Sequence, residues 1–159
     1  MTNIKIKTYG SNEPVSLSDF LSQKSPSIKY RVGCDSLNVR DKTIYITVLV
    51  GVHPNNNGAF ILYLKDKVPK INDMYKRLWY EVEKAVSFAS MLRENFNIDI
   101  EAVDLDLNSD PEHQSNKLLN SAVGYATSCG FPTYCKPQNV AAIYAADHLV
   151  HRKNIEKVA

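Results

Sequence analysis

The sequence has little of what marks several common classes of protein. Its three cysteines, Cys34, Cys129 and Cys135, are odd in number and form no CxxC pair. A disulfide framework or a tetrahedral zinc site is therefore not expected, and a reducing cytoplasm is. Lys5 and Lys7 are not followed by the apolar segment of a signal peptide, and no stretch approaches the length of a membrane span. These absences predict a cytoplasmic protein without a membrane partner.

The chain also lacks a strong charge of either sign. It has 159 residues, of which 19 are Lys or Arg and 17 are Asp or Glu, so the net charge is only +2. The length suits one domain, and the 44% hydrophobic content is typical of a soluble globular protein. This balance permits nucleic-acid binding without demanding it. If nucleic acid is the partner, the basic residues must be distributed asymmetrically around the acidic ones.

Hydrophobic periodicity predicts one domain of alternating strands and helices. The predicted strands are 3–8, 28–35, 42–53, 59–65, 98–107 and 131–136, and the predicted helices are 16–23, 73–95, 114–129 and 140–154. Three consecutive strands from residue 28 on, followed by alternating helices and strands, predict a mixed sheet with helices on both faces. Right-handed crossovers would make the first, fourth and fifth of these strands parallel neighbours.

Four carboxylates fall where an apolar side chain would be expected. Asp35 and Asp106 end predicted apolar strands, Glu81 borders the apolar stripe of one helix, and Asp147 falls within the buried stripe of another. An unpaired buried carboxylate costs several kcal/mol, and no Lys or Arg has a spacing that would pair with each acid. Divalent cations would supply the missing charge. Sites in such sheets form at the carboxyl ends of strands, which is where Asp35 and Asp106 are expected.

Each acid also has an ordinary interpretation. Asp35 could begin a turn after its strand. Asp104 and Asp106 project from the same face of one strand, about 7 Å apart, and Asp106 is favoured because it is nearer the strand end. Asp104 is then an accessory ligand or a hydrogen-bonded structural acid. Asp147 could form a buried ion pair, for instance with Lys136.

Several basic residues are weaker candidates. His151, one helical turn after Asp147, could approach the same site or be a solvated surface residue. His113, in the loop after the Asp106 strand, could assist proton transfer or lie on the surface. Lys117 and Lys136 are candidate contacts for nucleic-acid phosphates.

Taken together, these segments resemble the YkuK-type family of predicted ribonuclease H-like proteins of bacteria and their phages. The resemblance covers about residues 28–150 and is specific as a set rather than in any single motif. The matching segments are GCDS at 33–36, the hairpin ending GAFILYLK, YEVEKAVSFA at 80–89, DLDLN at 104–108, SNKLLNSAVGYA at 115–126 and GFPTYCKPQNVAAIYAADH at 130–148.

The resemblance implies a ribonuclease H-like fold, with a mixed five-stranded sheet in the order 3-2-1-4-5. Residues 28–159 would form this domain, and residues 1–27 an N-terminal extension packed on the core. Nucleic acid (RNA, DNA or a hybrid) would be the partner, and phosphodiester hydrolysis the reaction. The strand order, activity and partner are implied by the family and not by composition.

By the same resemblance, Asp35, Glu81, Asp106 and Asp147 correspond to the superfamily's catalytic acids. They would bind two Mg²⁺ or Mn²⁺ ions about 4 Å apart. Asp35 would bridge the ions, Glu81 and Asp106 would complete the ligands of one, and Asp147 would help to hold the other beside the attacking water.

Two alternatives stay open. The protein could be a non-catalytic nucleic-acid-binding or assembly module that keeps the fold. An ATPase of the same superfold is disfavoured because residues 36–41, after Asp35, contain no glycine for a phosphate-binding hairpin. The sequence leaves open the strand preference, endonuclease or exonuclease action, and assembly into a homo-oligomer.

Overall fold

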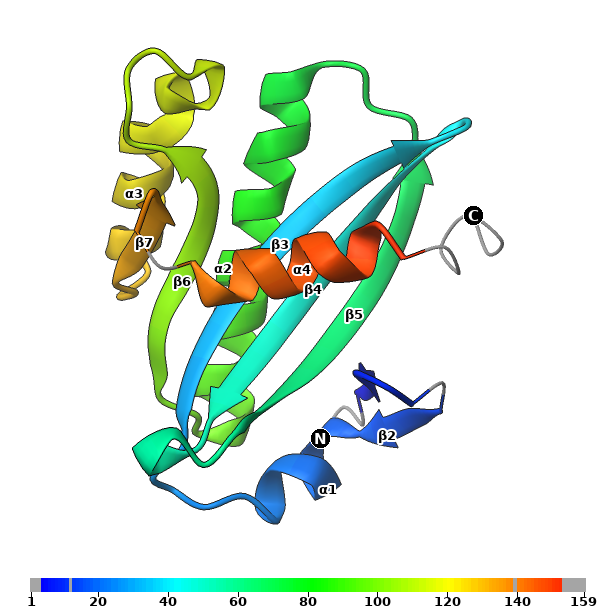
Figure 1. Cartoon of the computed structure of the whole chain (residues 1–159), viewed down its shortest axis with the longest axis vertical. Helices are drawn as coiled ribbons and strands as arrows, with labels where there is room; N and C mark the ends of the chain where they lie inside the picture. The colour runs from blue at the N-terminus through cyan, green and yellow to red at the C-terminus, as the bar shows by residue number, and fades with distance from the viewer. Residues whose placement is uncertain (1–3, 12, 139, 153–159) are drawn as a thin grey trace.

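The centre of the molecule is a long antiparallel hairpin, seen in a computed structural model that describes residues 4–11, 13–138 and 140–152 (Figure 1). Strand β3 (Lys29–Val39) pairs with β4 (Lys42–Val52) along its whole length, and β5 (Ala59–Pro69) pairs along the other edge of β4. β4 is central because hydrophobic side chains cover both of its faces. β3 was predicted to end at residue 35, but it continues for four more residues because β4 pairs with it that far.

The described residues form a seven-stranded sheet, not the five-stranded sheet that the family resemblance implied. The remaining strands are β1 (Lys5–Thr8), β2 (Pro14–Ser16), β6 (Ile100–Asn108) and β7 (Thr133–Lys136). The full order is β2-β1-β5-β4-β3-β6-β7, so the order 3-2-1-4-5 does not describe the whole sheet. The difference arises because β1 pairs with the free edge of β5 and β2 pairs with β1. β3, β6 and β7 are parallel neighbours, as expected.

Helices cover both faces of the sheet, as the sequence predicts (Figure 1). The helices are α1 (Leu17–Ser22), α2 (Met74–Phe96), α3 (Leu119–Ser128) and α4 (Ala141–Val150), with 3-10 helices at η1 (Pro54–Asn56) and η2 (Gln114–Leu118). α2 and α3 pack on one face, in the larger hydrophobic cluster. α4 crosses the other face over β3 and β4. No described helix is long and apolar enough to cross a lipid bilayer.

Local sequence explains how these helices are placed. α2 begins after Asp73, whose carboxylate accepts a hydrogen bond from the backbone N–H of Lys76, and ends at Asn97 in the left-handed conformation. α4 approaches β3 closely because the contact is made by small side chains. A Cβ added to Gly33 would lie 2.9 Å from Cβ of Ala142. This close contact brings α4 within reach of Asp35, two residues further along β3.

Gly33→Ala should destabilise the protein by about 1–3 kcal/mol, because the added methyl group must push α4 away from β3. Gly124→Ala is the matched control, since a Cβ there meets no atom within 4 Å and the site lies inside α3. It should stabilise by up to about 1 kcal/mol through helix propensity. Urea unfolding of both variants tests this, and equal changes in the two would contradict the close contact.

Candidate metal centre

Asp35 on β3 and Asp106 on β6 lie beyond the point where these two strands are paired with each other. β3 and β6 are hydrogen-bonded neighbours from Tyr30 to Val32, opposite Ile100 to Val103. Each acid follows the end of this pairing by three residues. The sheet is therefore open between the two acids, although neither strand has ended. Glu81, from α2 on the far face of the sheet, reaches them at this opening.

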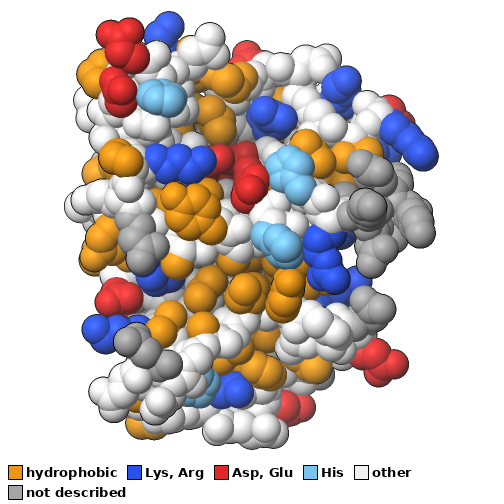
Figure 2. Space-filling model, in the orientation of Figure 1, with side chains coloured by type: hydrophobic (Ala, Val, Ile, Leu, Met, Phe, Trp, Pro, Cys, Tyr) orange, Lys and Arg blue, Asp and Glu red, His pale blue; other side chains and the backbone are white. Residues whose placement is uncertain are grey.

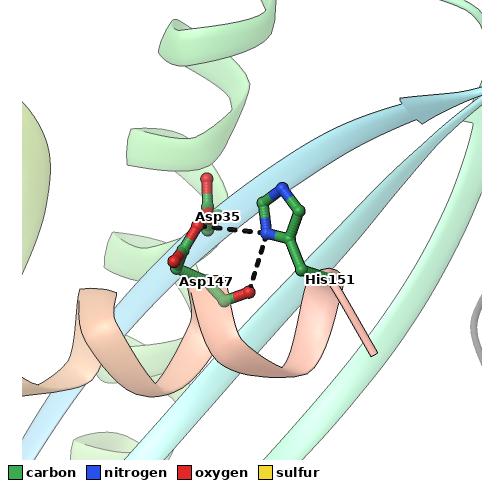
Figure 3. Close-up of side chains that lie close together, drawn as sticks. All are labelled: Asp35, Asp147 and His151. Atoms are coloured by element: carbon green, nitrogen blue, oxygen red, sulfur yellow. Dashed lines mark hydrogen bonds and ion pairs between the residues drawn. The ribbon is translucent and has the colours of Figure 1, made fainter. Parts of the chain in front are cut away.

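The four predicted acids come together as two overlapping groups. Ligand atoms of Asp35, Glu81 and Asp106 lie within 4.8 Å of one another, and so do those of Asp35, Asp147 and His151. Asp35 is common to both groups. Figure 3 shows Asp147 and His151 projecting from α4 toward Asp35 of β3. In Figure 2, acidic side chains near the middle of this face lie between basic side chains and histidines.

Asp35 is the most constrained of these acids. Its side chain is buried, and its Oδ1 accepts a hydrogen bond of 2.8 Å from the backbone N–H of Ser36. Burial and then the charges of Asp106 and Asp147 raise the pKa of Asp35 to about 7, although the hydrogen bond from Ser36 acts in the opposite direction. The ionised form of Asp35 is therefore disfavoured, and the nearby charge of Lys136 does not offset burial and the two neighbouring acids.

Glu81 is held by a residue to which the sequence analysis gave no role. The hydroxyl of Ser36 donates a short hydrogen bond to Oε1 of Glu81. Glu81 is only 5% exposed, so burial raises its pKa well above the usual value, with a further contribution from Asp35. Ser36 follows Asp35 in the GCDS motif and therefore faces α2. Strand alternation next to a site acid was the signal that could have identified it.

Asp106 lies at an irregularity of β6. The register with β7 shifts between Leu105 and Asn108, which is the geometry of a bulge that redirects a side chain. Lys136 of β7 forms an ion pair of 2.5 Å with Oδ1 of Asp106. Burial alone would lower the pKa of Lys136, but its hydrogen bond to Asp106 and the nearby acids outweigh burial and raise it. The expectation that Lys136 could pair with Asp147 is wrong, because Lys136 contacts Asp106 instead.

Asp147 is not buried, contrary to the sequence prediction. Its side chain is 58% exposed, because α4 turns Ala142, Ala146 and Leu149 toward the sheet and leaves Asp147 at the edge of that stripe. Oδ1 of Asp147 lies 3.1 Å from Nδ1 of His151, one turn further along. The pair therefore forms the solvent-facing side of the cluster, next to Asp35.

Asp104 has a different environment from Asp106. Its Oδ1 accepts hydrogen bonds from Nε and Nη2 of Arg31, and its Oδ2 accepts one of 2.9 Å from the backbone N–H of Ala142. The Arg31 side chain is 11% exposed and that of Asp104 is fully buried. Both oxygens of Asp104 thus bind protein donors, which agrees with the structural interpretation of this acid.

His113 and Lys117 stay predictions. His113 precedes η2 in the loop after β6 and is exposed. Lys117 lies in η2, also exposed, with its Nζ 5.9 Å from the ring centre of Tyr75. Neither residue belongs to the two groups of ligand atoms found among the described residues.

The fold agrees with what sequence comparison finds. A family model described as Ribonuclease H-like matches residues 16–151, so the chain belongs to the ribonuclease H-like family. The match confirms the resemblance drawn from the motifs and is consistent with its YkuK-type branch. It also begins before residue 28, where the motif resemblance begins. No curated protein matches the chain.

One solved structure with a detectable likeness is a Ciona intestinalis endonuclease V in complex with a 24mer DNA containing an inosine followed by a ribo-adenosine. The sequences are 14% identical and the TM-score is 0.44. The match covers 81% of this chain and 56% of that chain. A likeness of this size identifies neither an activity nor a substrate.

The raised pKa of Asp35 gives a pH dependence of stability. A carboxyl group that holds its proton more tightly when folded stabilises the protein at low pH, and this contribution is lost as the pH rises from about 4 to about 7. In EDTA, the Tm should therefore fall between pH 5 and pH 8. Asp35→Asn should make the fall shallower, whereas Asp99→Asn, at an exposed position before β6, should not. Parallel curves for the wild type and Asp35→Asn would contradict the assignment.

Asp104→Ala should cost about 3–5 kcal/mol of stability, because it removes the carboxylate that pairs with the buried Arg31 guanidinium. Glu101→Ala on the same strand breaks only the exposed pair with Lys29, and should cost no more than about 1 kcal/mol. Urea unfolding measures both effects. If Asp104→Ala kept its stability and lost only Mn²⁺ affinity, Asp104 would be a ligand and not a structural acid.

Proposed function

We propose that this protein is a metal-dependent nuclease that hydrolyses phosphodiester bonds of nucleic acid with two divalent ions, Mg²⁺ or Mn²⁺. The observation that supports this is the shared position of Asp35. It belongs to one group of ligand atoms with Glu81 and Asp106, and to a second with Asp147 and His151. Two such groups with one common carboxylate suit a pair of ions bridged by Asp35.

The donor chemistry of the cluster fits such ions. Carboxylate oxygens are the ligands that Mg²⁺ and Mn²⁺ prefer, and a cation would relieve the repulsion that raises the pKa of Asp35. A thiolate site for a softer metal is disfavoured, since burial raises the pKa of the Cys34 thiol well above its usual value. When bound, two such ions activate a water molecule and stabilise the departing oxygen.

The surrounding residues would hold the cluster ready for this chemistry. Ser36 donates hydrogen bonds through its backbone to Asp35 and through its hydroxyl to Glu81, so one residue orients both acids. His151, beside Asp147 on the open side, is placed to accept a proton from the attacking water. Lys136 neutralises Asp106 while no cation is bound, and would then be free to contact a substrate phosphate.

One observation favours a second candidate, a nucleic-acid-binding or assembly module that keeps the fold without catalysis. Lys136 already pairs with Asp106, so Asp106 has a positive partner without binding a metal ion. The two candidates differ in a single experiment, in which Mn²⁺ is titrated by calorimetry alongside a cleavage screen of RNA, DNA and hybrid substrates. Metal binding without cleavage of any substrate would favour the module.

Asp35→Asn and Asp106→Asn should each lower the cleavage rate by at least about 100-fold, because losing even an outer partner of a metal ligand costs 10–100-fold. Glu81→Gln should do the same. The assay is cleavage of labelled oligonucleotides in Mg²⁺ and in Mn²⁺, on proteins whose folding is verified by circular dichroism.

Matched controls come from the same elements. Glu94→Gln lies on α2 like Glu81, and Asp99→Asn precedes β6 like Asp106, and both positions are exposed. Both controls should retain wild-type cleavage and Mn²⁺ affinity. A folded Asp35→Asn variant with full activity would exclude the two-ion site.

A further inference from the structure

In the described part of the chain, the large apolar side chains that are exposed are all tyrosines. They are Tyr9, Tyr134 and Tyr144, which are 48%, 37% and 59% exposed. Apolar side chains scattered singly on a surface need no explanation, whereas a group of them beside a polar site indicates a binding surface. The position of each tyrosine relative to the acidic cluster therefore decides whether it has a role in binding.

Tyr134 of β7 lies on the face of the sheet that α4 covers. The centre of its ring is 4.5 Å from the guanidinium carbon of Arg31, a distance typical of cation–π attraction. Arg31 is bound to Asp104, which also accepts a hydrogen bond from the backbone of α4. Arg31 therefore restrains the ring from one side. Two residues further along β7, about 7 Å away, Lys136 pairs with Asp106 of the cluster.

Tyr144 lies on α4, beside the acid that this helix contributes to the cluster. It precedes Asp147 by three residues, so the two Cβ atoms are about 5–6 Å apart on one flank of the helix. Its side chain faces solvent. Tyr9, by contrast, is engaged with α4, since its hydroxyl lies 3.2 Å from Nε2 of His148. We name Tyr134 and Tyr144 the flanking tyrosines.

Exposed aromatic rings beside a phosphodiester site suit unpaired bases. A base offers its flat face to a protein only where it is not stacked within a duplex, and such bases stack on aromatic side chains. The net charge of +2 also provides little positive charge for backbone phosphates, so contacts with bases would contribute a larger share of the affinity. Figure 2 shows hydrophobic side chains, the colour class that includes tyrosine, next to the acids on this face.

We propose that the flanking tyrosines stack against unpaired bases of a single-stranded nucleic acid and thereby select single strands over duplexes. This inference rests on the proposed nuclease function for the position of the phosphate that is cut, at Asp35. Tyr134, restrained by Arg31 on one side, offers the other face of its ring to a base. Tyr144 contacts a base one helical turn from Asp147.

The test compares the binding of a short labelled single strand with that of a duplex of the same sequence, for RNA and for DNA. Fluorescence anisotropy is measured in EDTA at pH 6, where no metal supports cleavage and Asp35, with a pKa of about 7, is mostly protonated. The wild type should bind the single strand more tightly. Tyr134→Ala and Tyr144→Ala should each weaken single-strand binding by about 5- to 140-fold, the loss of one stacked base, and leave duplex binding unchanged.

Two sets of controls separate stacking from other effects. Tyr134→Phe and Tyr144→Phe keep the rings and should keep the wild-type affinity. Tyr80→Ala removes a tyrosine of α2, over the other face of the sheet, that also has a cation near its ring, with Nζ of Lys76 at 5.9 Å. It should bind as the wild type does. The slope of log affinity against log salt should be the same in every variant, because none removes a charge.

Several results would overturn the inference. They are equal losses on the single strand and the duplex, full single-strand affinity in both alanine variants, and no single-strand binding by the wild type. Sedimentation velocity tests a second copy of the chain as the occupant of this surface. A wild-type dimer that Tyr144→Ala dissociates, without a change in single-strand binding, would also overturn the inference.

The outcomes separate this inference from the proposed function. If the wild type cleaves single strands and the alanine variants bind and cleave equally well, stacking is excluded and the nuclease stands. If single-strand binding depends on the flanking tyrosines but no substrate is cut in Mg²⁺ or Mn²⁺, the nuclease is excluded and the tyrosines stand as a binding surface. Thermal melting verifies that every variant is folded.

Discussion

The site depends on one buried carboxylate that is not itself in the cluster. Asp104 accepts hydrogen bonds from Arg31 on β3 and from the backbone N–H of Ala142, the second residue of α4, while its own backbone belongs to β6. It thereby joins the three elements that carry Asp35, Asp106 and Asp147. α4 has no side-chain cap of its own at Val140, so Asp104 also accepts from an amide that would otherwise lack a partner. A neutral residue there would remove the carboxylate that binds both the Arg31 guanidinium and the backbone N–H of Ala142.

This anchor lies just below the opening that makes the cluster accessible. The pairing of β3 with β6 stops at Val32 and Val103, and beyond it β3 stays paired only with β4, and β6 only with β7. Asp104 directly follows the last residue of β6 that pairs with β3, and it binds Arg31 and α4. Asp106 lies two residues further along, where β6 no longer pairs with β3, and it belongs to the acidic cluster. Glu81 can then join from the opposite face, which alternation within a continuous sheet would prevent.

The sequence predicted which acids the fold brings together better than it predicted their surroundings. Asp35, Glu81, Asp106 and Asp147 could be chosen because an acid on an apolar strand or helix border is conspicuous. The burial of Asp147 was predicted wrongly, since a helical stripe of small residues does not specify which edge faces the sheet. β2 has only three residues, Pro14–Ser16, too few for a periodic pattern, and its existence depends on pairing with β1. Likewise, Lys136 could be assigned to Asp106 only once the register of β7 was known.

The acids of the cluster differ in the partners that offset their negative charge, and this difference indicates where an added positive charge has most effect. Glu81 has the hydroxyl of Ser36, Asp106 has Lys136, and Asp147 has His151 and solvent. Asp35 lies between them with a backbone hydrogen bond from Ser36 and a side-chain contact with Asp147, itself an acid, and its pKa is raised by burial and by the neighbouring charges. A sequence selected for stability alone would place an amide or an apolar residue at such a position. Retaining a carboxylate there is therefore easiest to explain if a cation completes the fold at Asp35.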